Sequence, residues 1–185
     1  MLTALVVTAG LLSGAPGIPK DFLLHEKQAR AASATWTVLD NPEHEDVWNA
    51  QCTRAGLKGW SARRDLTYDR DIGGGEETNA MRGEQVFVFS KASGARTMMA
   101  RMRTLMKGCK DITPARPKIG DEAVAGILRL KGELPQTQKF VAVRRGSAIA
   151  LYWDLANRAK PLRTMAAHLK DAEKMSARLC RIGGC

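Results

Sequence analysis

The sequence is poor in aromatic residues, which make up only 5% of its 185 residues. No basic stretch alternates with Phe, Tyr or Trp, the pattern by which proteins stack on the bases of nucleic acids. A nucleic-acid ligand is therefore not indicated, although 29 basic and 19 acidic side chains give a net charge of +10. That excess favours other anionic neighbours, such as lipid head groups, cell-wall polymers or acidic proteins.

Sequence motifs of catalysis and metal binding are also missing. The histidines His25, His44 and His168 have no partner at metal-binding spacing, and no serine has a G-x-S-x-G context. The three glycines at 73–75 lack the Lys-Ser/Thr ending of a phosphate-binding loop. We interpret the histidines as surface or structural residues and expect no metal, no cofactor and no enzymatic activity.

The sequence has no apolar run long enough to span a bilayer. The apolar segment at 1–17 ends in small residues, as the hydrophobic region of a signal peptide does, but it lacks the basic residues that precede such a region. It fits equally well a first helix that packs its leucines and valines inward. We expect residues 1–20 to be a signal-like segment or an N-terminal arm, and residues 21–185 to form one domain.

Four cysteines are spread through the chain without a C-x-x-C pair, at Cys52, Cys109, Cys180 and Cys185. An even, widely spaced set is typical of disulfides in an oxidising compartment. Three pairings are possible, and the short link between Cys180 and Cys185 favours a bridge there, which leaves Cys52 with Cys109. Four reduced thiols in the core are the alternative. The disulfide interpretation predicts a secreted or cell-envelope protein.

Hydrophobic patterning predicts both strands and helices, in an order that does not repeat β-α-β units. Strands are expected at 21–28, 60–70, 82–89, 120–130, 139–145 and 147–154, and helices at 43–52, 91–109 and from about Pro161 to Cys180. Short links between the strands favour antiparallel pairing. The predicted fold class is therefore α+β, an antiparallel β-sheet with amphipathic helices packed on it and stapled by two disulfides.

The helix at 91–109 has the clearest pattern. Ser90 is placed to cap it, and one face is an apolar stripe that includes Met98, Met102 and Leu105. The other face carries basic residues and no acidic one: Arg96, Arg101, Arg103 and Lys107. Their spread over the helix surface suits a polymer or a broad acidic partner better than a small anion. An ordinary solvated surface is the alternative.

Several segments, in their order along the chain, are similar to a known family: EQVFVFSKASGARTMMARMRTLMKGC, GDEAVA, the hairpin VAVRRGSAIALYW and the closing LCRIGGC. With the cysteine placement, they resemble the extracellular sensor domain of actinobacterial PknH-type serine/threonine kinases, and more closely its stand-alone secreted and lipoprotein relatives. The resemblance covers residues 21–185. It implies an α+β fold with two disulfides and a cleft for an undefined ligand outside the cell. Kinase signalling is not implied, because the sequence contains no kinase segment.

We therefore expect a monomeric, secreted or envelope-associated, non-enzymatic binding domain with a sensor-like role. Its partner would be a small ligand or an envelope polyanion, and the candidate ligand-binding residues on the expected sheet are Tyr68, Arg144 and Trp153. A second hypothesis is a secreted basic protein that binds or inhibits an acidic macromolecule through the 91–109 helix. A third is an enzyme whose site is assembled from residues that the sequence does not connect.

Overall fold

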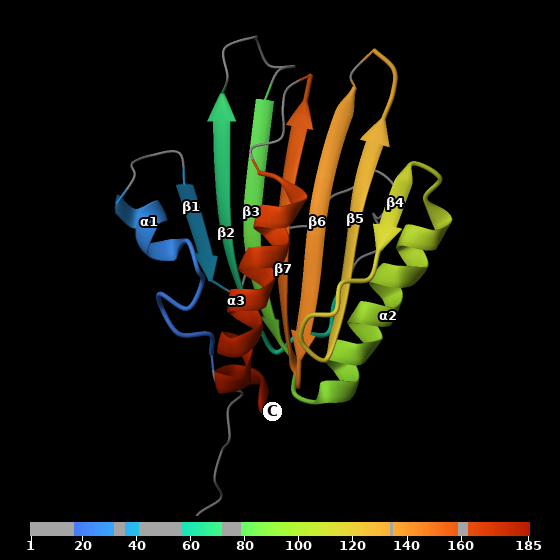
Figure 1. The fold of residues 1–185 in the computed structure, drawn as a ribbon. Coiled ribbons are helices and arrows are strands. Elements are labelled where there is room, and N and C mark those ends of the chain that lie inside the picture. Colours follow the sequence, from blue (N-terminus) through green and yellow to red (C-terminus); the bar gives the residue numbers. More distant parts are fainter. Residues whose placement is uncertain (1–16, 32–35, 41–56, 72–78, 134, 159–162) are drawn as a thin grey trace, which may run out of the picture.

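The computed structural model describes residues 17–31, 36–40, 57–71, 79–133, 135–158 and 163–185. The strands in these ranges form one antiparallel sheet (Figure 1). Across the sheet the order is β1 (Trp36–Asp40), β2 (Ala62–Asp71), β3 (Asn79–Val88), β7 (Ala148–Asn157), β6 (Gln136–Arg145), β5 (Glu122–Leu130) and β4 (Ile112–Ala115). The α+β fold class is confirmed.

The three helices of the described chain lie on both faces of this sheet. They are α1 (Glu26–Ala31), α2 (Ala92–Gly108) and α3 (Met165–Gly183). In Figure 1, α3 crosses the middle of the sheet and α2 lies by β4 and β5. Alternation along β6 explains the two faces, because Phe140 and Ala142 point to the α2-side core whereas Val141 and Val143 point to the α3-side core.

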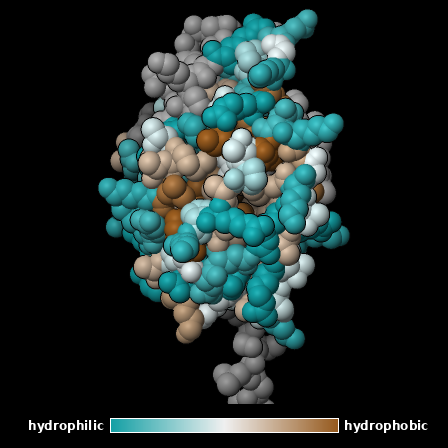
Figure 2. Space-filling model, turned by 45° about the vertical axis from the view of Figure 1, so that its right-hand side comes forward, coloured by the Kyte–Doolittle hydropathy of each residue, from teal (hydrophilic) through white to brown (hydrophobic). Residues whose placement is uncertain are grey.

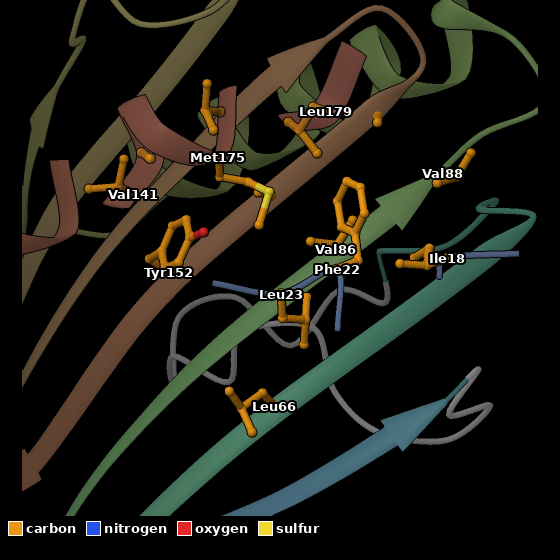
Figure 3. Packing of buried hydrophobic residues seen from close by; sticks show 14 of the residues in the cluster. Ile18, Phe22, Leu23, Leu66, Val86, Val88, Val141, Tyr152, Met175 and Leu179 are labelled. Carbon is orange, nitrogen blue, oxygen red and sulfur yellow. The ribbon is translucent and has the colours of Figure 1, made fainter. Parts of the chain in front are cut away.

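The α2-side core confirms the predicted apolar stripe, since Met98 and Met102 are buried and Leu105 is half-buried against it. The α3-side core joins the N-terminal segment to the sheet and to α3. In Figure 3, Phe22 and Leu23 lie among Leu66, Val86, Tyr152, Met175 and Leu179. Residues from both ends of the described chain therefore cover the same face of the sheet.

Two of the expected elements are wrong in detail. The segment expected as a strand at 21–28 is a turn followed by α1, because Phe22 and Leu23 are buried side by side instead of alternating across a sheet. Ser90 does not cap α2, whose N-cap is Lys91 without a side-chain hydrogen bond. The closing helix begins after Thr164, whose hydroxyl accepts a hydrogen bond from the amide of Ala167.

Some expectations fall outside the described residues. These are residues 1–16 of the signal-like segment or arm expected at 1–20, the helix at 43–52 and the start of the last helix at Pro161. Within the described residues, no helix is long and apolar enough to span a membrane.

The C-terminal tail is fastened to the β6–β7 turn. Gly146 has φ 52°, and a Cβ there would lie 1.9 Å from the carbonyl oxygen of Gly184, so the turn requires glycine. The amide and hydroxyl of Ser147 both donate to the carbonyl oxygen of Gly183, at 2.8 and 2.9 Å. The tail therefore completes the hydrogen bonding at this end of the hairpin.

The predicted disulfide between Cys180 and Cys185 is present, and it closes the tail on the last turn of α3. It is the one disulfide whose two cysteines both lie in the described part of the chain. Cys109 follows α2, is buried and is not free. Cys52 lies outside the described residues, so the Cys52–Cys109 bridge stays a prediction.

Candidate functional site

A carboxylate is buried within the α3-side core. Glu84 lies on β3 in alternation with Val86 and Val88, so its side chain points toward the core between the sheet and the N-terminal segment. Its Oε1 accepts hydrogen bonds from the amide of Leu24, at 2.8 Å, and from the hydroxyl of Tyr152, at 2.7 Å. Its Oε2 accepts from the amide of His25 at 3.1 Å. Through these hydrogen bonds, Glu84 joins β3 to the N-terminal segment and to β7.

Burial dominates the ionisation of this cluster. It raises the pKa of Glu84 above the ordinary value, although the hydrogen bonds from Leu24 and Tyr152 act in the opposite direction. Burial also raises the pKa of Tyr152, and the charge of Glu84 raises it further. The Tyr152 hydroxyl therefore keeps its proton and acts as a donor.

A second carboxylate, Asp171 on α3, holds two basic side chains. Its Oδ2 accepts hydrogen bonds from Nε2 of His25 at 3.0 Å and from the guanidinium of Arg163 at 2.5 Å. Burial alone would raise the pKa of Asp171, but the hydrogen bond and charge of His25, with the charge of Arg163, outweigh it and lower that pKa. Asp171 is therefore a fixed negative charge that positions both partners.

These two carboxylates border one pocket, which we call the α3-side pocket. It is a narrow, partly open hollow, and a water-sized sphere can occupy about 10 Å³ of it, room for roughly one water molecule. The charged and histidine side chains that line it are His25, Arg82, Glu84, Arg163, His168 and Asp171. Leu66 and Tyr152 add apolar wall. An apolar wall with a few converging polar groups is typical of small-molecule sites.

One side chain of the pocket is buried without a hydrogen bond. His168 on α3 is 2% exposed, and neither of its ring nitrogens has a hydrogen-bond partner among the described residues. Its Nε2 lies 3.6 Å from Oδ1 of Asp154, an acceptor that is also buried without a hydrogen-bond partner among the described residues. Nε of Arg163 is likewise buried and unpartnered within the described chain, although the amide of Arg163 donates to Oδ2 of Asp154 at 2.9 Å. Buried polar groups without partners are uncommon, and ordered water, an ion or a ligand can satisfy them.

The sequence-predicted ligand residues are not brought together. Tyr68 lies on the α3 side of β2, and the guanidinium of Arg82 lies 5.3 Å from its ring centroid. Trp153 contributes to the pocket wall, but its indole covers Gly83 and packs against the α2-side core. Arg144 lies at the end of the β6–β7 hairpin, where it is bonded to Asp121, Glu122 and the carbonyl oxygen of Gly146. Its contacts are those of a structural residue.

The basic residues of α2 differ among themselves. Arg96, Arg101 and Lys107 are exposed, whereas Arg103 is half-buried and forms an ion pair with Glu122 on β5. Arg103 and Lys107 border a groove between α2 and β4, which we call the α2–β4 groove. The remaining residues of its lining are Met106, Pro114, Ala115, Arg116 and Val124, and it encloses about 550 Å³, including open solvent. Figure 2, turned to bring this side of the molecule forward, shows apolar patches bordered by hydrophilic side chains.

No group of three or more His, Cys, Asp or Glu side chains in the described residues is arranged to hold a metal ion. Sequence reasoning missed most of the α3-side pocket. A detectable signal was Glu84, which occupies an inward position of the strand alternation that Val86 and Val88 define. His25 and Asp171 are 146 residues apart, so their contact depends on the fold alone.

Comparisons with known proteins find a similar fold but no similar sequence. No family model and no curated protein matches the chain. Among solved structures, the chain is similar to the extracellular domain of PknH from Mycobacterium tuberculosis, with a TM-score of 0.54 and 13% sequence identity. The similarity covers 91% of this chain and 97% of the other. At this identity the match shows a shared fold alone.

Proposed function

We propose that this chain is an extracytoplasmic, non-enzymatic, sensor-like domain that binds a small ligand in the α3-side pocket. The observation that carries the proposal is His168, buried in the wall of a charged pocket with both ring nitrogens unpartnered among the described residues. The shared fold with an extracellular sensor domain supports the role. The Cys180–Cys185 disulfide supports the location, because disulfides persist in oxidising compartments.

The partners of the pocket side chains favour binding over catalysis. The Tyr152 hydroxyl donates to Glu84, and His25 donates to Asp171. The Tyr152 hydroxyl and the His25 ring are therefore each held by a carboxylate that fixes its orientation. Such an arrangement holds a ligand in one pose, and within the described residues of the pocket no side chain is activated as a nucleophile by a neighbouring base.

A thermal-shift screen tests this proposal. The panel contains small carboxylates, phosphate esters, amines and sugars, because a ligand that binds only the folded chain raises its melting temperature. At least one class should stabilise the wild type and Lys107→Gln, which alters the α2–β4 groove. The same class should fail to stabilise Arg163→Gln. A panel without any stabilising compound would argue against the pocket as a ligand site.

The α2–β4 groove supports a second candidate function, the binding of an acidic macromolecule. Lys107 and Arg116 are exposed at its border, whereas the charge of Arg103 is already paired with Glu122. Replacing both exposed residues by Glu should abolish binding to an anionic cell-wall polymer, and wild-type binding should weaken as salt rises. Arg129→Glu, at an exposed position on β5, is the matched control. Unchanged polymer binding by the double variant would exclude the groove.

A further inference from the structure

The α2–β4 groove has room for a side chain of a partner molecule. A water-sized sphere can occupy about 200 Å³ of it. A cavity of about 150 Å³ is large enough to hold a benzene molecule. The groove therefore accepts a side chain of the size of leucine or phenylalanine. It lies beside the edge strand of the sheet, on the side of the molecule that Figure 2 brings forward.

The bottom of the groove is apolar. Pro114 pairs with Gly126 across the β4–β5 ladder, so it lies on the same face of the sheet as Val124, two residues along β5. Met106 completes the apolar lining from the side of α2. Pro114 is exposed, whereas Met106 and Val124 are buried beneath it. An apolar side chain seated on these residues would leave water, which favours binding.

The rim of the groove is positively charged on both sides. Lys107 lies on α2, and Arg116 follows the end of β4. Both are exposed, and neither forms an ion pair within the described chain. Arg103 also borders the groove, but its charge is already paired with Glu122. No acidic residue is among the described residues of the lining. A partner with a carboxylate near each wall would therefore complement the rim.

The sheet edge at the groove is unsuited to the addition of a further strand. β4 has only 4 residues, and its Pro114 has no N–H to donate. Short edge strands and prolines are the features by which proteins prevent pairing with another strand. Side-chain contacts, not backbone hydrogen bonds, therefore have to supply the affinity for a partner.

The apolar bottom of the groove distinguishes between two kinds of acidic partner. An anionic polysaccharide carries charge along its length but has no apolar side chain to bury, so it would meet the charged rim alone. An acidic peptide segment supplies both an apolar side chain and carboxylates. The combination of an apolar bottom with a basic rim therefore favours a peptide.

We propose that the α2–β4 groove binds an extended acidic segment of a partner protein. One apolar side chain of that segment fills the groove, and acidic residues on either side of it pair with Lys107 and Arg116. This inference rests on the second candidate function, the binding of an acidic macromolecule, and it names the class of that macromolecule. The partner is distinct from the small ligand proposed for the α3-side pocket.

An NMR titration of the ¹⁵N-labelled full chain tests the proposal with three synthetic peptides and one polymer. The first peptide has a central leucine flanked by glutamates, the second has glutamine in place of every glutamate, and the third has glycine in place of the leucine. Dextran sulfate is the polymer, because it is anionic and has no apolar side chain. The first peptide should shift the amides of Lys107 and Arg116 in a saturable way. The second and third should each bind at least about tenfold more weakly.

Variants of the two exposed cations separate the groove from the rest of the helix surface. Lys107→Gln and Arg116→Gln should each weaken binding of the first peptide about threefold, the effect of one exposed ion pair, and the double variant about tenfold. Arg101→Gln removes the same charge from an exposed position on α2 outside the groove and should bind as the wild type does. An equal loss of affinity in Arg101→Gln would overturn the groove as the binding site.

The outcomes also separate this proposal from the second candidate function. If the third peptide or dextran sulfate shifts the groove amides with the affinity of the first peptide, the assignment to a peptide with an apolar side chain is overturned. The groove then remains a site for acidic macromolecules. If neither the peptides nor the polymer shifts these amides, the proposal and the second candidate function both fail.

Discussion

Tyr152 and Glu84 face each other directly across the β7–β3 pair, and the tyrosine hydroxyl donates a 2.7 Å hydrogen bond to the carboxylate. The pair lies beside a cluster of buried Ile, Leu, Val, Phe, Met and Ala side chains. An apolar pair of similar size would fill the same space without the cost of burying a carboxylate. The position of this pair beside the α3-side pocket is consistent with a role in ligand binding.

Replacing Glu84 by Gln should change how stability depends on pH. The folded pKa of Glu84 is raised, so its side chain contributes most favourably below its unfolded pKa, and that contribution is lost as pH rises through the folded pKa. The free energy of unfolding of Glu84→Gln, relative to wild type, should therefore rise between about pH 4 and about pH 8. Urea denaturation at both pH values measures this difference. Glu173→Gln, at an exposed position on α3, is the control variant. A relative stability that falls with pH would contradict the shift.

Asp171 should show the opposite behaviour. Its folded pKa is lowered below the ordinary 3.8, so its contribution is present above that value and is lost as pH falls through the folded pKa. Asp171→Asn should have a lower free energy of unfolding than the wild type at about pH 7, and this difference should disappear at about pH 2. Equal deficits at both pH values, in the same urea experiment, would mean that the ion pairs with His25 and Arg163 contribute nothing.

The buried pair of Glu26 and Arg64 should be essential for the N-terminal segment. Glu26 is fully buried at the start of α1 and accepts hydrogen bonds from the guanidinium of Arg64 on β2, one of them at 3.0 Å. Glu26→Ala leaves the Arg64 charge poorly compensated and should cost about 3 kcal/mol of unfolding free energy. Glu173→Ala, exposed on α3, should change it by less than about 0.5 kcal/mol. Similar values for the two variants would show that the buried pair does not anchor the segment.

Gly83 should not tolerate a side chain. A Cβ there would lie 2.3 Å from the indole of Trp153, its direct partner on β7. Gly83→Ala should therefore displace Trp153 and lower stability by about 1 to 3 kcal/mol. Gly108→Ala is the matched control, since no atom lies within 4 Å of a Cβ at the end of α2. Trp fluorescence during chemical denaturation measures both, and an unaltered Gly83→Ala variant would disprove the packing.

Non-reducing peptide mapping should recover two disulfides. The Cys180–Cys185 bridge closes a short loop, for which chain entropy predicts about 2 kcal/mol of stabilisation. Cys109 should be recovered in a peptide linked to Cys52. A Cys109 peptide linked to any other cysteine, or an alkylated Cys109, would contradict that pairing.

The sequence predicted the long regular elements because their periodicity is strong, as in the methionine stripe of α2 and the β6–β7 hairpin with Gly146 at its turn. It missed β4, which is a four-residue strand at the sheet edge that contains Pro114. The segment with Phe22 and Leu23 was misjudged because a short apolar run does not distinguish a strand from a packed turn. The pocket could not be predicted, since contacts such as His25 with Asp171 require the whole sheet to form first.

The central claim is that ligand binding occurs in the α3-side pocket and not in the α2–β4 groove. Amide chemical-shift mapping of the ¹⁵N-labelled chain, with the panel compound that raises the melting temperature most, tests it directly. The account predicts that the largest shifts fall on Leu24, His25 and Arg163, whose amides donate to the two acids Glu84 and Asp154. Shifts concentrated at Lys107 and Arg116, with the pocket amides unmoved, would contradict it.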